Sequence, residues 1–318
     1  MFNYTKLQLA MLLLMSLMVC ACSRDANLTN TQIYLGDKTK HVFVIVMDGA
    51  RYSETFGDST HRYVPQLYSY FTQYGVIASA FKNKGQTLTN ASHAAMCAGV
   101  YQSIDNGGNT LPAQPSAFQY WLQTYNRDPS KAWVITSKDK LHVLGNTTDA
   151  TYQNKYLPRL NCGPNGINSG YRDDTTTLRV AKEILVLHQP ELVLLQFKEP
   201  DPAGHSGNLN HYLNSIITTD SLIVNFIKYT ESLPAYAGST SYLITNDHGR
   251  HTDDFVSHGD ACEGCQHIML LAAGPDFASH KSIGTAYETP DIAATVASLL
   301  HFQMPTCQGN VMLDLFKK

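Results

Sequence analysis

Hydrophobic residues occur along the chain in two alternating patterns. Short apolar runs predict strands at residues 41–47, 133–136, 192–197, 241–245 and 268–273. These runs are nearly continuous rather than alternating, as in parallel strands that are buried on both faces. Between them, apolar residues recur every three or four positions and predict helices around residues 180–185, 216–227 and 292–300.

Strands that alternate with helices predict an α/β fold, a three-layer α/β/α sandwich around a largely parallel sheet. The last helix follows Pro290-Asp291, a favourable helix start. Residues 145–176 are polar and irregular, and we expect them to form a long excursion over the functional site rather than a second domain.

The N-terminal segment does not follow this pattern. An apolar run over residues 7–19 has the length of a signal peptide and is too short to span a bilayer. It ends in Val19-Cys20-Ala21-Cys22, which resembles a bacterial lipobox. We therefore expect residues 1–22 to be a lipoprotein signal peptide and the lipidated Cys22 to anchor the protein to a membrane; a plain secretory signal is the alternative.

The rest of the chain then divides into a polar tether, residues 23–40, and a single catalytic domain, residues 41–318. Ser23, directly after the cysteine, resembles the residue that sorts lipoproteins to the outer membrane. The sequence thus predicts an exported bacterial lipoprotein that faces the periplasm.

Charge excludes one class of partner. The chain of 318 residues carries 23 Lys and Arg against 26 Asp and Glu, a net charge of −3. A nucleic-acid-binding protein would show a basic stripe, so we expect no nucleic-acid partner. Only 15% of residues are charged and 43% are hydrophobic, which excludes a disordered chain and suffices for a core.

Export would permit disulfides. Of the cysteines beyond the lipobox, Cys97 lies in an Ala-rich helical stretch and is expected to be a free core thiol. Cys262-Glu-Gly-Cys265 favours a disulfide over half of a zinc knuckle, because the chain has no second pair of this spacing.

Acidic residues and histidines follow three of the predicted strands. In open α/β sheets, ligands bind beyond the carboxyl ends of the strands, so these residues should meet at one edge. The set comprises Asp48, Asp201, His205, Asp247, His248 and, ten residues later, His258. Mixed histidine and carboxylate ligands suit zinc, and six of them suit a site for two divalent ions. Without cations, burying three carboxylates together would be strongly unfavourable.

A nucleophile is expected beside these ions. Thr89 stands at the start of a predicted helix of small residues, where backbone N–H groups favour an anion. The pKa of a threonine hydroxyl is too high for it to ionise at neutral pH, and a neighbouring metal ion would lower that pKa. The alternative is that Thr89 only caps the helix.

These residues, in this order, resemble the alkaline phosphatase superfamily. The resemblance rests on Asp48-Gly49, Thr89-x-x-x-His93, Asp201-x-x-x-His205, Asp247-His248-Gly249 and His258-Gly259. It implies that Asp201, His205 and His258 hold one of two divalent metal ions, which we expect to be zinc. It also implies that Asp48, Asp247 and His248 hold the other, with Thr89 beside them.

The segment around Thr89 resembles the nucleotide pyrophosphatase/phosphodiesterase branch and related single-threonine phosphatases. It lacks the cysteine or serine motif of sulfatases, and the phosphoglycerate mutase branch uses serine. The resemblance implies that an asparagine some 20 residues beyond Thr89 binds a phosphoryl oxygen; Asn109 fits this spacing and Asn106 is its rival.

Two lysines favour a monoester substrate, because a monoester dianion carries more negative charge than a diester and is bound by more cationic side chains. Lys138 and Lys140 follow the second predicted strand and resemble a Lys-Asp-Arg segment of one exported alkaline phosphatase group, although Lys140 replaces the arginine. A solvated lysine-rich loop is the alternative. Arg250 and His251 follow a metal motif and are expected either to contact substrate or to lie at the surface.

The sequence therefore predicts an exported two-metal phosphohydrolase that acts on a small-molecule phosphate ester through a phospho-threonine. A phosphomonoesterase is favoured, and a phosphodiesterase or nucleotide pyrophosphatase is the alternative. A phospho-headgroup transferase and a catalytically inactive binding lipoprotein are more remote.

Overall fold

The predicted strands form the centre of one mixed sheet. The computed structural model describes residues 33–318. The five apolar runs are β1 (His41–Met47), β3 (Ala132–Thr136), β5 (Leu192–Phe197), β6 (Thr240–Thr245) and β7 (His267–Ala273). The sequence did not predict β2 (Gly75–Lys82), β4 (Arg159–Cys162), β8 (Lys281–Ile283) or β9 (Tyr287–Glu288).

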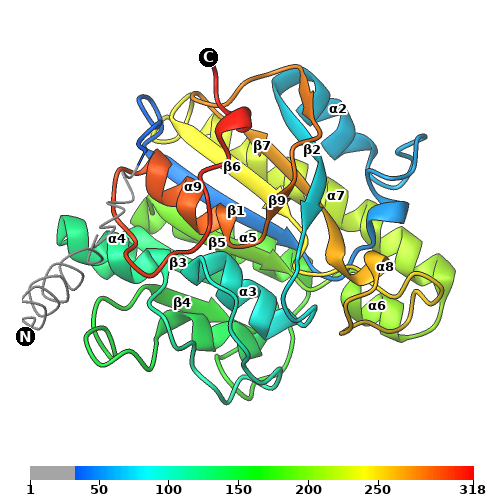
Figure 1. Ribbon diagram of the computed structural model, residues 1–318, viewed down its shortest axis with the longest axis horizontal. Coiled ribbons are helices and arrows are strands. Elements are labelled where there is room, and N and C mark those ends of the chain that lie inside the picture. Colours follow the sequence, from blue (N-terminus) through cyan, green and yellow to red (C-terminus); the bar gives the residue numbers. More distant parts are fainter. Residues whose placement is uncertain (1–32) are drawn as a thin grey trace, which may run out of the picture. The chain divides into compact units, whose positions relative to one another are not determined.

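The sheet is largely parallel, as predicted. Its strand order is β4-β3-β5-β1-β6-β7-β2-β8, with β9 also paired to β2. Among the described strands only β7 runs against the others, since its pairings with β6 and β2 are antiparallel and the remaining pairings are parallel. The strands β3, β5, β1 and β6 therefore end at the same edge (Figure 1).

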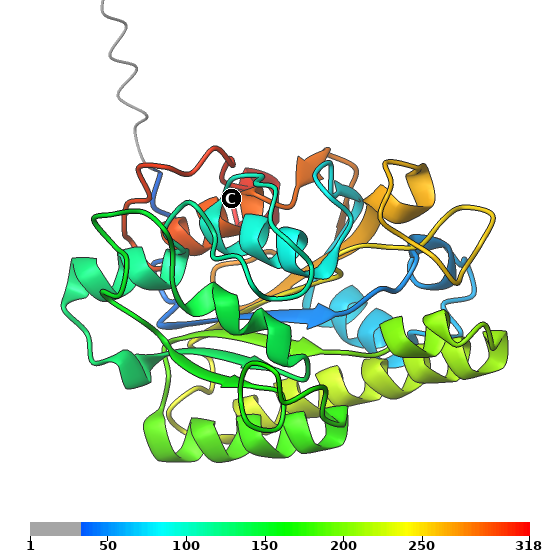
Figure 2. The ribbon, with the colours of Figure 1, turned by 90° about the horizontal axis from the view of Figure 1, so that it is seen from below.

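Helices cover both faces of this sheet, which gives the three layers of an α/β/α sandwich (Figure 2). One face carries α2 (Pro65–Tyr74), α5 (Asp174–His188) and α7 (Leu209–Ser232). The other carries α3 (Thr89–Ala98), α4 (Ala117–Tyr125) and α9 (Asp291–Leu299). The remaining elements are two short α-helices, α6 (Asp201–His205) and α8 (Glu263–Gln266), and the 3₁₀ helices η1 (Tyr52–Glu54), η2 (Pro129–Lys131), η3 (Asp139–Gly145) and η4 (Leu313–Leu315).

The continuous apolar runs explain these layers. In β1, Val42, Val44 and Val46 pack into the core on the α3 side, whereas Phe43, Ile45 and Met47 pack into the core on the α7 side. Successive side chains of a strand point to opposite faces, so a strand with helices on both sides needs apolar residues at every position. The predicted pattern and the observed burial agree for this reason.

Two segments differ from their predictions. The end of the predicted tether belongs to the folded unit, since Leu35 packs against the core and the Thr39 hydroxyl donates to Asp276 Oδ2 at 2.6 Å. Residues 145–176 belong to the same compact unit as the rest of residues 33–318, but they are not wholly irregular as expected, because they supply the edge strand β4. The predicted signal peptide and Cys22 lie outside the described residues. Within residues 33–318, no helix is both long enough and apolar enough to cross a membrane.

The states of the cysteines agree with the predictions only in part. Cys97 is a buried free thiol, as predicted. The predicted disulfide between Cys262 and Cys265 is wrong for this structure, in which both are free.

Candidate active site

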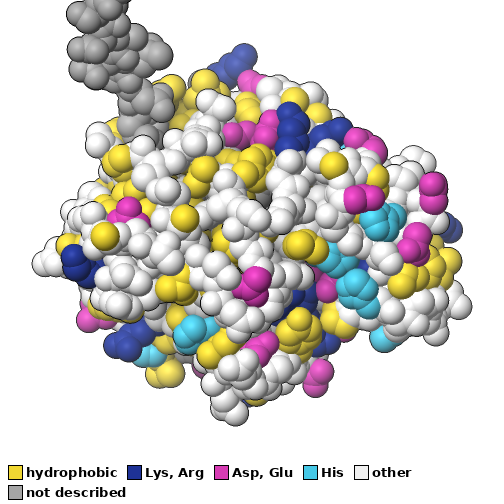
Figure 3. All heavy atoms as spheres, turned by 60° about the horizontal axis from the view of Figure 1, so that its bottom comes forward, with side chains coloured by type: hydrophobic (Ala, Val, Ile, Leu, Met, Phe, Trp, Pro, Cys, Tyr) yellow, Lys and Arg dark blue, Asp and Glu magenta, His cyan; other side chains and the backbone are white. Residues whose placement is uncertain are grey.

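The parallel strands bring the predicted chemical groups to one buried edge. Asp48 directly follows β1, Lys138 follows β3, Asp201 begins α6 shortly after β5, and Asp247 and His248 follow β6. All five residues are buried. The His205 side chain is 48% exposed, so this edge lies close to solvent. Figure 3 shows histidine side chains at the molecular surface.

Gly49 allows these segments to approach one another. Its φ of +73° lies in the left-handed region, and a Cβ there would come within 2.8 Å of Asp201 Cβ. Its backbone amide donates to Asp247 Oδ1 at 3.1 Å. The Asp48-Gly49 pair therefore positions a carboxylate and also leaves room for two more.

Asp48, Asp247 and His248 form the first candidate metal group. One potential ligand atom from each lies within 4.8 Å of the others. His248 Nε2 is 3.4 Å from Asp247 Oδ2 and 3.8 Å from Asp48 Oδ1. Asp247 Oδ2 and His248 Nε2 are buried and have no hydrogen-bond partner among the described residues. Buried polar atoms normally have partners, so these converging atoms fit a cation.

His248 is in the state that a metal ligand requires. Its Nδ1 lies 2.9 Å from the carbonyl oxygen of Gly249, which assigns the proton to Nδ1 and leaves the Nε2 lone pair facing the carboxylates. Burial lowers the pKa of His248 to about 4, and this outweighs the nearby carboxylates. The ring is therefore neutral at physiological pH.

Asp201, His205 and His258 form the second candidate group. The Nε2 atoms of His205 and His258 lie 3.2 and 3.5 Å from Asp201 Oδ1 and 3.2 Å from each other. Ligands on bonds of about 2.1 Å around a tetrahedral zinc ion would be about 3.4 Å apart. His258 Nδ1 is held at 2.9 Å by the carbonyl oxygen of Thr87, and burial lowers the pKa of His258 to about 4.

The two groups are adjacent. The rings of His248 and His258 stack with their centroids 3.8 Å apart. Ligand atoms of Asp201, His248 and His258 also lie within 4.8 Å of one another. The six predicted ligands thus form one continuous cluster of candidate metal-binding side chains.

Lys138 lies inside this cluster. Its side chain is fully buried, and Nζ is 2.8 Å from Asp48 Oδ1, 2.7 Å from Asp201 Oδ2 and 3.3 Å from Thr89 Oγ1. Burial alone would lower the pKa of Lys138, but Asp201 and Asp48 outweigh it and raise the pKa. The alternative of a solvated loop is therefore excluded.

The pKa values of Asp48 and Asp201, the two carboxylates that contact Lys138, shift in opposite directions. Burial and the neighbouring Asp247 raise the pKa of Asp48. Burial would also raise the pKa of Asp201, but the cations around it, Lys138 first, hold that pKa well below its usual range. The charge of Asp48 is thus less well compensated than that of Asp201, so an additional cation next to Asp48 would stabilise the cluster.

Thr89 is the first residue of α3, and it is 1% exposed. Leu88 holds the N-cap position and no side chain caps the helix, so Thr89 is not the cap that the alternative required. Its hydroxyl faces Lys138 instead. One turn later, His93 Nδ1 lies 2.8 Å from the Thr89 carbonyl oxygen and 3.6 Å from Asp247 Oδ2. The first turn of α3, which carries Thr89, is thereby joined to the cluster of candidate metal ligands.

The two candidate asparagines differ in position. Asn106 Oδ1 accepts hydrogen bonds from the Asn90 backbone amide at 3.0 Å and from Lys140 Nζ at 3.1 Å. Asn109 is exposed, and its side chain faces Asp105 at 3.4 Å. The structure therefore places Asn106, the rival, beside the nucleophile segment and does not bring Asn109 there. Lys140 is buried, and burial together with Lys138 lowers its pKa to about 8.

Sequence reasoning missed the positioning residue Gln196 and expected another position for Arg250. Gln196 Nε2 donates to Asp48 Oδ2 at 2.7 Å, and a polar residue within the apolar run of β5 was the available signal. Arg250 is fully buried, and its Nε, Nη1 and Nη2 atoms all donate to protein groups, so it neither lies at the surface nor is placed to contact substrate. Its Nη2 donates to Asp201 Oδ1 at 2.5 Å and its Nε donates to the Gly49 carbonyl oxygen at 3.1 Å. Arg250 thus holds the carboxylate of Asp201, one of the candidate metal ligands, in position.

No protein-family model matches the chain, and no curated protein matches it in sequence. Several solved structures match in fold. Murine ectonucleotide pyrophosphatase/phosphodiesterase 5 matches with a TM-score of 0.60 at 15% identity, over 87% of this chain and 100% of that chain. The phosphonate monoester hydrolase of Silicibacter pomeroyi matches with a TM-score of 0.63 at 12% identity, over 87% of this chain and 76% of that chain.

A Vibrio parahaemolyticus protein of the alkaline phosphatase superfamily matches with a TM-score of 0.64 at 14% identity, over 89% of this chain and 71% of that chain. The chain therefore has the alkaline phosphatase superfamily fold, and the resemblance drawn from the sequence motifs is confirmed at the level of the fold.

Proposed function

We propose that the protein is a two-metal phosphohydrolase that cleaves phosphate esters through a phospho-threonine intermediate, with a preference for monoesters. The observation that carries the proposal is that the ammonium group of Lys138 contacts Thr89, Asp48 and Asp201, and that the two aspartates belong to the cluster of six metal-type ligands. Asp201, His205 and His258 would hold one zinc ion, and Asp48, Asp247 and His248 the other. Zinc ions bound there would supply Lewis acidity to the reaction.

The chain's own groups account for the rest of the reaction. Thr89 loses its hydroxyl proton to solvent and Oγ1 attacks phosphorus, while the ester oxygen leaves on the opposite side and takes a proton from solvent as the free alcohol. Water then attacks the phospho-threonine, which releases phosphate and returns a proton to Thr89 Oγ1. Lys138, next to Thr89 Oγ1, neutralises charge on the phosphoryl oxygens. Asn106 and Lys140, which hydrogen-bond each other beside the Asn90 amide, bind the outer oxygens.

The superfamily neighbours are consistent with this chemistry. They include a phosphonate monoester hydrolase, a nucleotide pyrophosphatase/phosphodiesterase and the PsFucS1 sulfatase of Pseudoalteromonas sp.. An inactive threonine-to-alanine form of the murine phosphodiesterase is described in complex with AMP. That neighbour keeps a nucleotide diester as the second candidate substrate.

The nucleophile is tested by substitution. Thr89→Ala should lower kcat by roughly 10³-fold or more, because removing a covalent nucleophile leaves only residual catalysis. Thr89→Ser keeps a hydroxyl and should retain much more activity, which controls for loss of folding. Undiminished turnover of both p-nitrophenyl phosphate and bis-p-nitrophenyl phosphate by Thr89→Ala would refute the mechanism.

The monoester preference is tested separately with Lys140→Met. A dianion loses more than a monoanion when a cation is removed, so kcat/KM should fall further for p-nitrophenyl phosphate than for the diester. Equal losses on both substrates would show that Lys140 does not set the preference.

We also propose export and anchoring through a lipidated Cys22, on the lipobox resemblance alone. Mass spectrometry of the mature N-terminus tests this. A diacylated Cys22 that is lost in Cys22→Ser, together with release of the protein from the membrane fraction, is the expected result; an unmodified N-terminus in a membrane-free fraction would refute it.

A further inference from the structure

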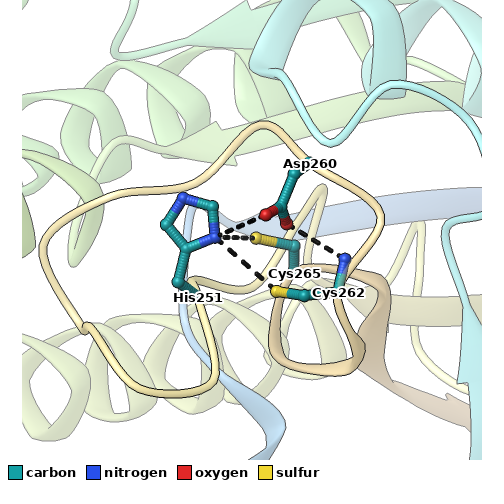
Figure 4. A group of neighbouring side chains, drawn as sticks. All are labelled: His251, Asp260, Cys262 and Cys265. Carbon is teal, nitrogen blue, oxygen red and sulfur yellow. Dashed lines mark hydrogen bonds and ion pairs between the residues drawn. The ribbon is translucent and has the colours of Figure 1, made fainter.

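Four side chains with metal-binding atoms converge outside the candidate active site. They belong to the segment between β6 and β7 and are His251, Asp260, Cys262 and Cys265 (Figure 4). One ligand atom from each lies within 4.8 Å of all the others. His251 Nδ1 is 3.6 Å from Cys262 Sγ, 3.5 Å from Cys265 Sγ and 3.1 Å from Asp260 Oδ2.

These separations match the edges of a tetrahedral zinc site. Zinc bonds of about 2.3 Å to sulfur and about 2.05 Å to nitrogen place the two ligand atoms about 3.6 Å apart. A nitrogen and an oxygen ligand on bonds of about 2.1 Å would be about 3.4 Å apart. The sulfur–nitrogen distances agree closely with these values, and the nitrogen–oxygen distance needs only a small opening.

The local backbone suits the same ion. The Cys262 carbonyl oxygen accepts the amides of Cys265 at 3.1 Å and Gln266 at 3.0 Å, which turns the chain so that both sulfurs face His251. Cys265 is buried and Cys262 is partly buried. Two thiolates, an imidazole and a carboxylate form a closed set of four ligands, which is typical of structural rather than catalytic zinc.

We propose that His251, Asp260, Cys262 and Cys265 bind a structural zinc ion. On binding, each thiol releases its proton to the solvent and the thiolate forms the bond to the metal. The proposal is independent of the proposed enzymatic activity, because none of the four residues belongs to the catalytic cluster.

The ion would close a loop that carries one catalytic ligand. His251 lies at the start of this loop and the other three ligands lie at its end, so His258 is between them in the chain. The base of the loop is already paired, since the Arg250 amide donates to the Gly264 carbonyl oxygen at 3.0 Å. Thr87 Oγ1 donates to the Asp260 carbonyl oxygen at 2.7 Å, and the Thr87 carbonyl oxygen faces His258 Nδ1. Zinc would therefore fix the segment that positions His258.

Cobalt substitution provides a selective test. The six candidate catalytic ligands include no sulfur, so thiolate-to-cobalt charge-transfer absorption in the near ultraviolet reports only a thiolate site. The full chain is purified with a reductant that does not bind metals, stripped with a chelator and loaded with Co²⁺. We expect the charge-transfer band in the wild type, and its loss in Cys262→Ser and in Cys265→Ser.

Cys307→Ser is the matched control, because Cys307 is a free, partly buried thiol outside the cluster. It should keep the band, and the zinc-loaded Cys262→Ser variant should bind one zinc ion fewer per chain than the control by elemental analysis. Because the band requires no turnover, it distinguishes failure of this proposal from failure of the proposed hydrolase activity.

Two results would overturn the proposal. One is a wild-type protein with reduced thiols that shows no charge-transfer band. The other is a disulfide between Cys262 and Cys265, found by peptide mapping of the protein as isolated without reductant.

Discussion

Replacing Lys138 with methionine should destabilise the metal-free protein far more than the metal-loaded protein. Lys138 Nζ makes contacts of 2.8 and 2.7 Å with Asp48 and Asp201, and all three side chains are almost fully buried. Removing one partner of a buried ion pair costs about 3–5 kcal/mol, because the remaining charge is buried without compensation. Methionine has a similar length, so loss of packing adds little.

Bound zinc changes this cost. The ions would neutralise the same two carboxylates, so the substitution should then cost less than about 1.5 kcal/mol, as for a volume-conserving change. For a chain of this size, about 3–5 kcal/mol corresponds to a melting-point decrease on the order of 10 °C. We expect this decrease in EDTA and only a small fraction of it in saturating zinc.

Thermal unfolding followed by circular dichroism measures both decreases. Lys84→Met is the control, since the exposed Lys84–Glu288 pair should not respond to metal. The thermodynamic cycle also requires Lys138→Met to bind zinc more tightly, by about 100-fold for a difference of about 3 kcal/mol. Equal decreases in EDTA and in zinc would refute the assignment of Asp48 and Asp201 as metal ligands.

Three further predictions follow from particular contacts. The pKa of Lys140 is lowered to about 8, so its positive charge is lost as pH rises through that value and kcat/KM for a monoester should fall there. Lys140→Arg should remove this decrease from the pH profile. A decrease that is unchanged in Lys140→Arg would show that another group titrates there. Gly49→Ala should cost about 1–3 kcal/mol for its left-handed φ of +73°, and should weaken zinc binding by displacing Asp201; calorimetric zinc titration that equals wild type would contradict this. Asp220 accepts the amides of Gln66 and Leu67 at 3.0 and 2.7 Å, so Asp220→Ala should lower the free energy of unfolding in urea by about 1–3 kcal/mol, and an unchanged midpoint would show that water replaces the carboxylate.

Most of the sheet and the meeting of the six candidate ligands at its edge could be predicted because both follow from simple periodic rules. Buried parallel strands must be apolar at every position, and polar residues that end them must meet at one edge. The strand β2 does not obey the first rule, since Ser79 in its second half is exposed, and β8 and β9 are only 3 and 2 residues long. Such strands exist through pairing with their neighbours rather than through a local pattern.

The remaining site residues depend on loop conformation, which no spacing rule describes. Asn106 and Asn109 flank two glycines, and Gly108 has a φ of +86°, so the direction of each side chain is set by the turn. The Asp105 carboxylate draws Asn109 away from the nucleophile segment. Similarly, Cys262 and Cys265 lie beside a histidine and an aspartate that the loop brings close, whereas the zinc-knuckle pattern requires a second cysteine pair in the sequence.

The strand order has a consequence for how the protein is assembled. The strand β1 lies between β5 and β6, so Asp48 meets Asp201 and Asp247 only after some 150 to 200 intervening residues have been placed. Closing such long loops is slow and depends on many distant contacts. A chain interrupted before β6 would retain Asp48 and Asp201 but lack Asp247, His248 and His258. Tight retention of metal would therefore mark chains that have completed synthesis and folding, and unfinished or nicked chains would be left with unneutralised carboxylates and exposed to proteases.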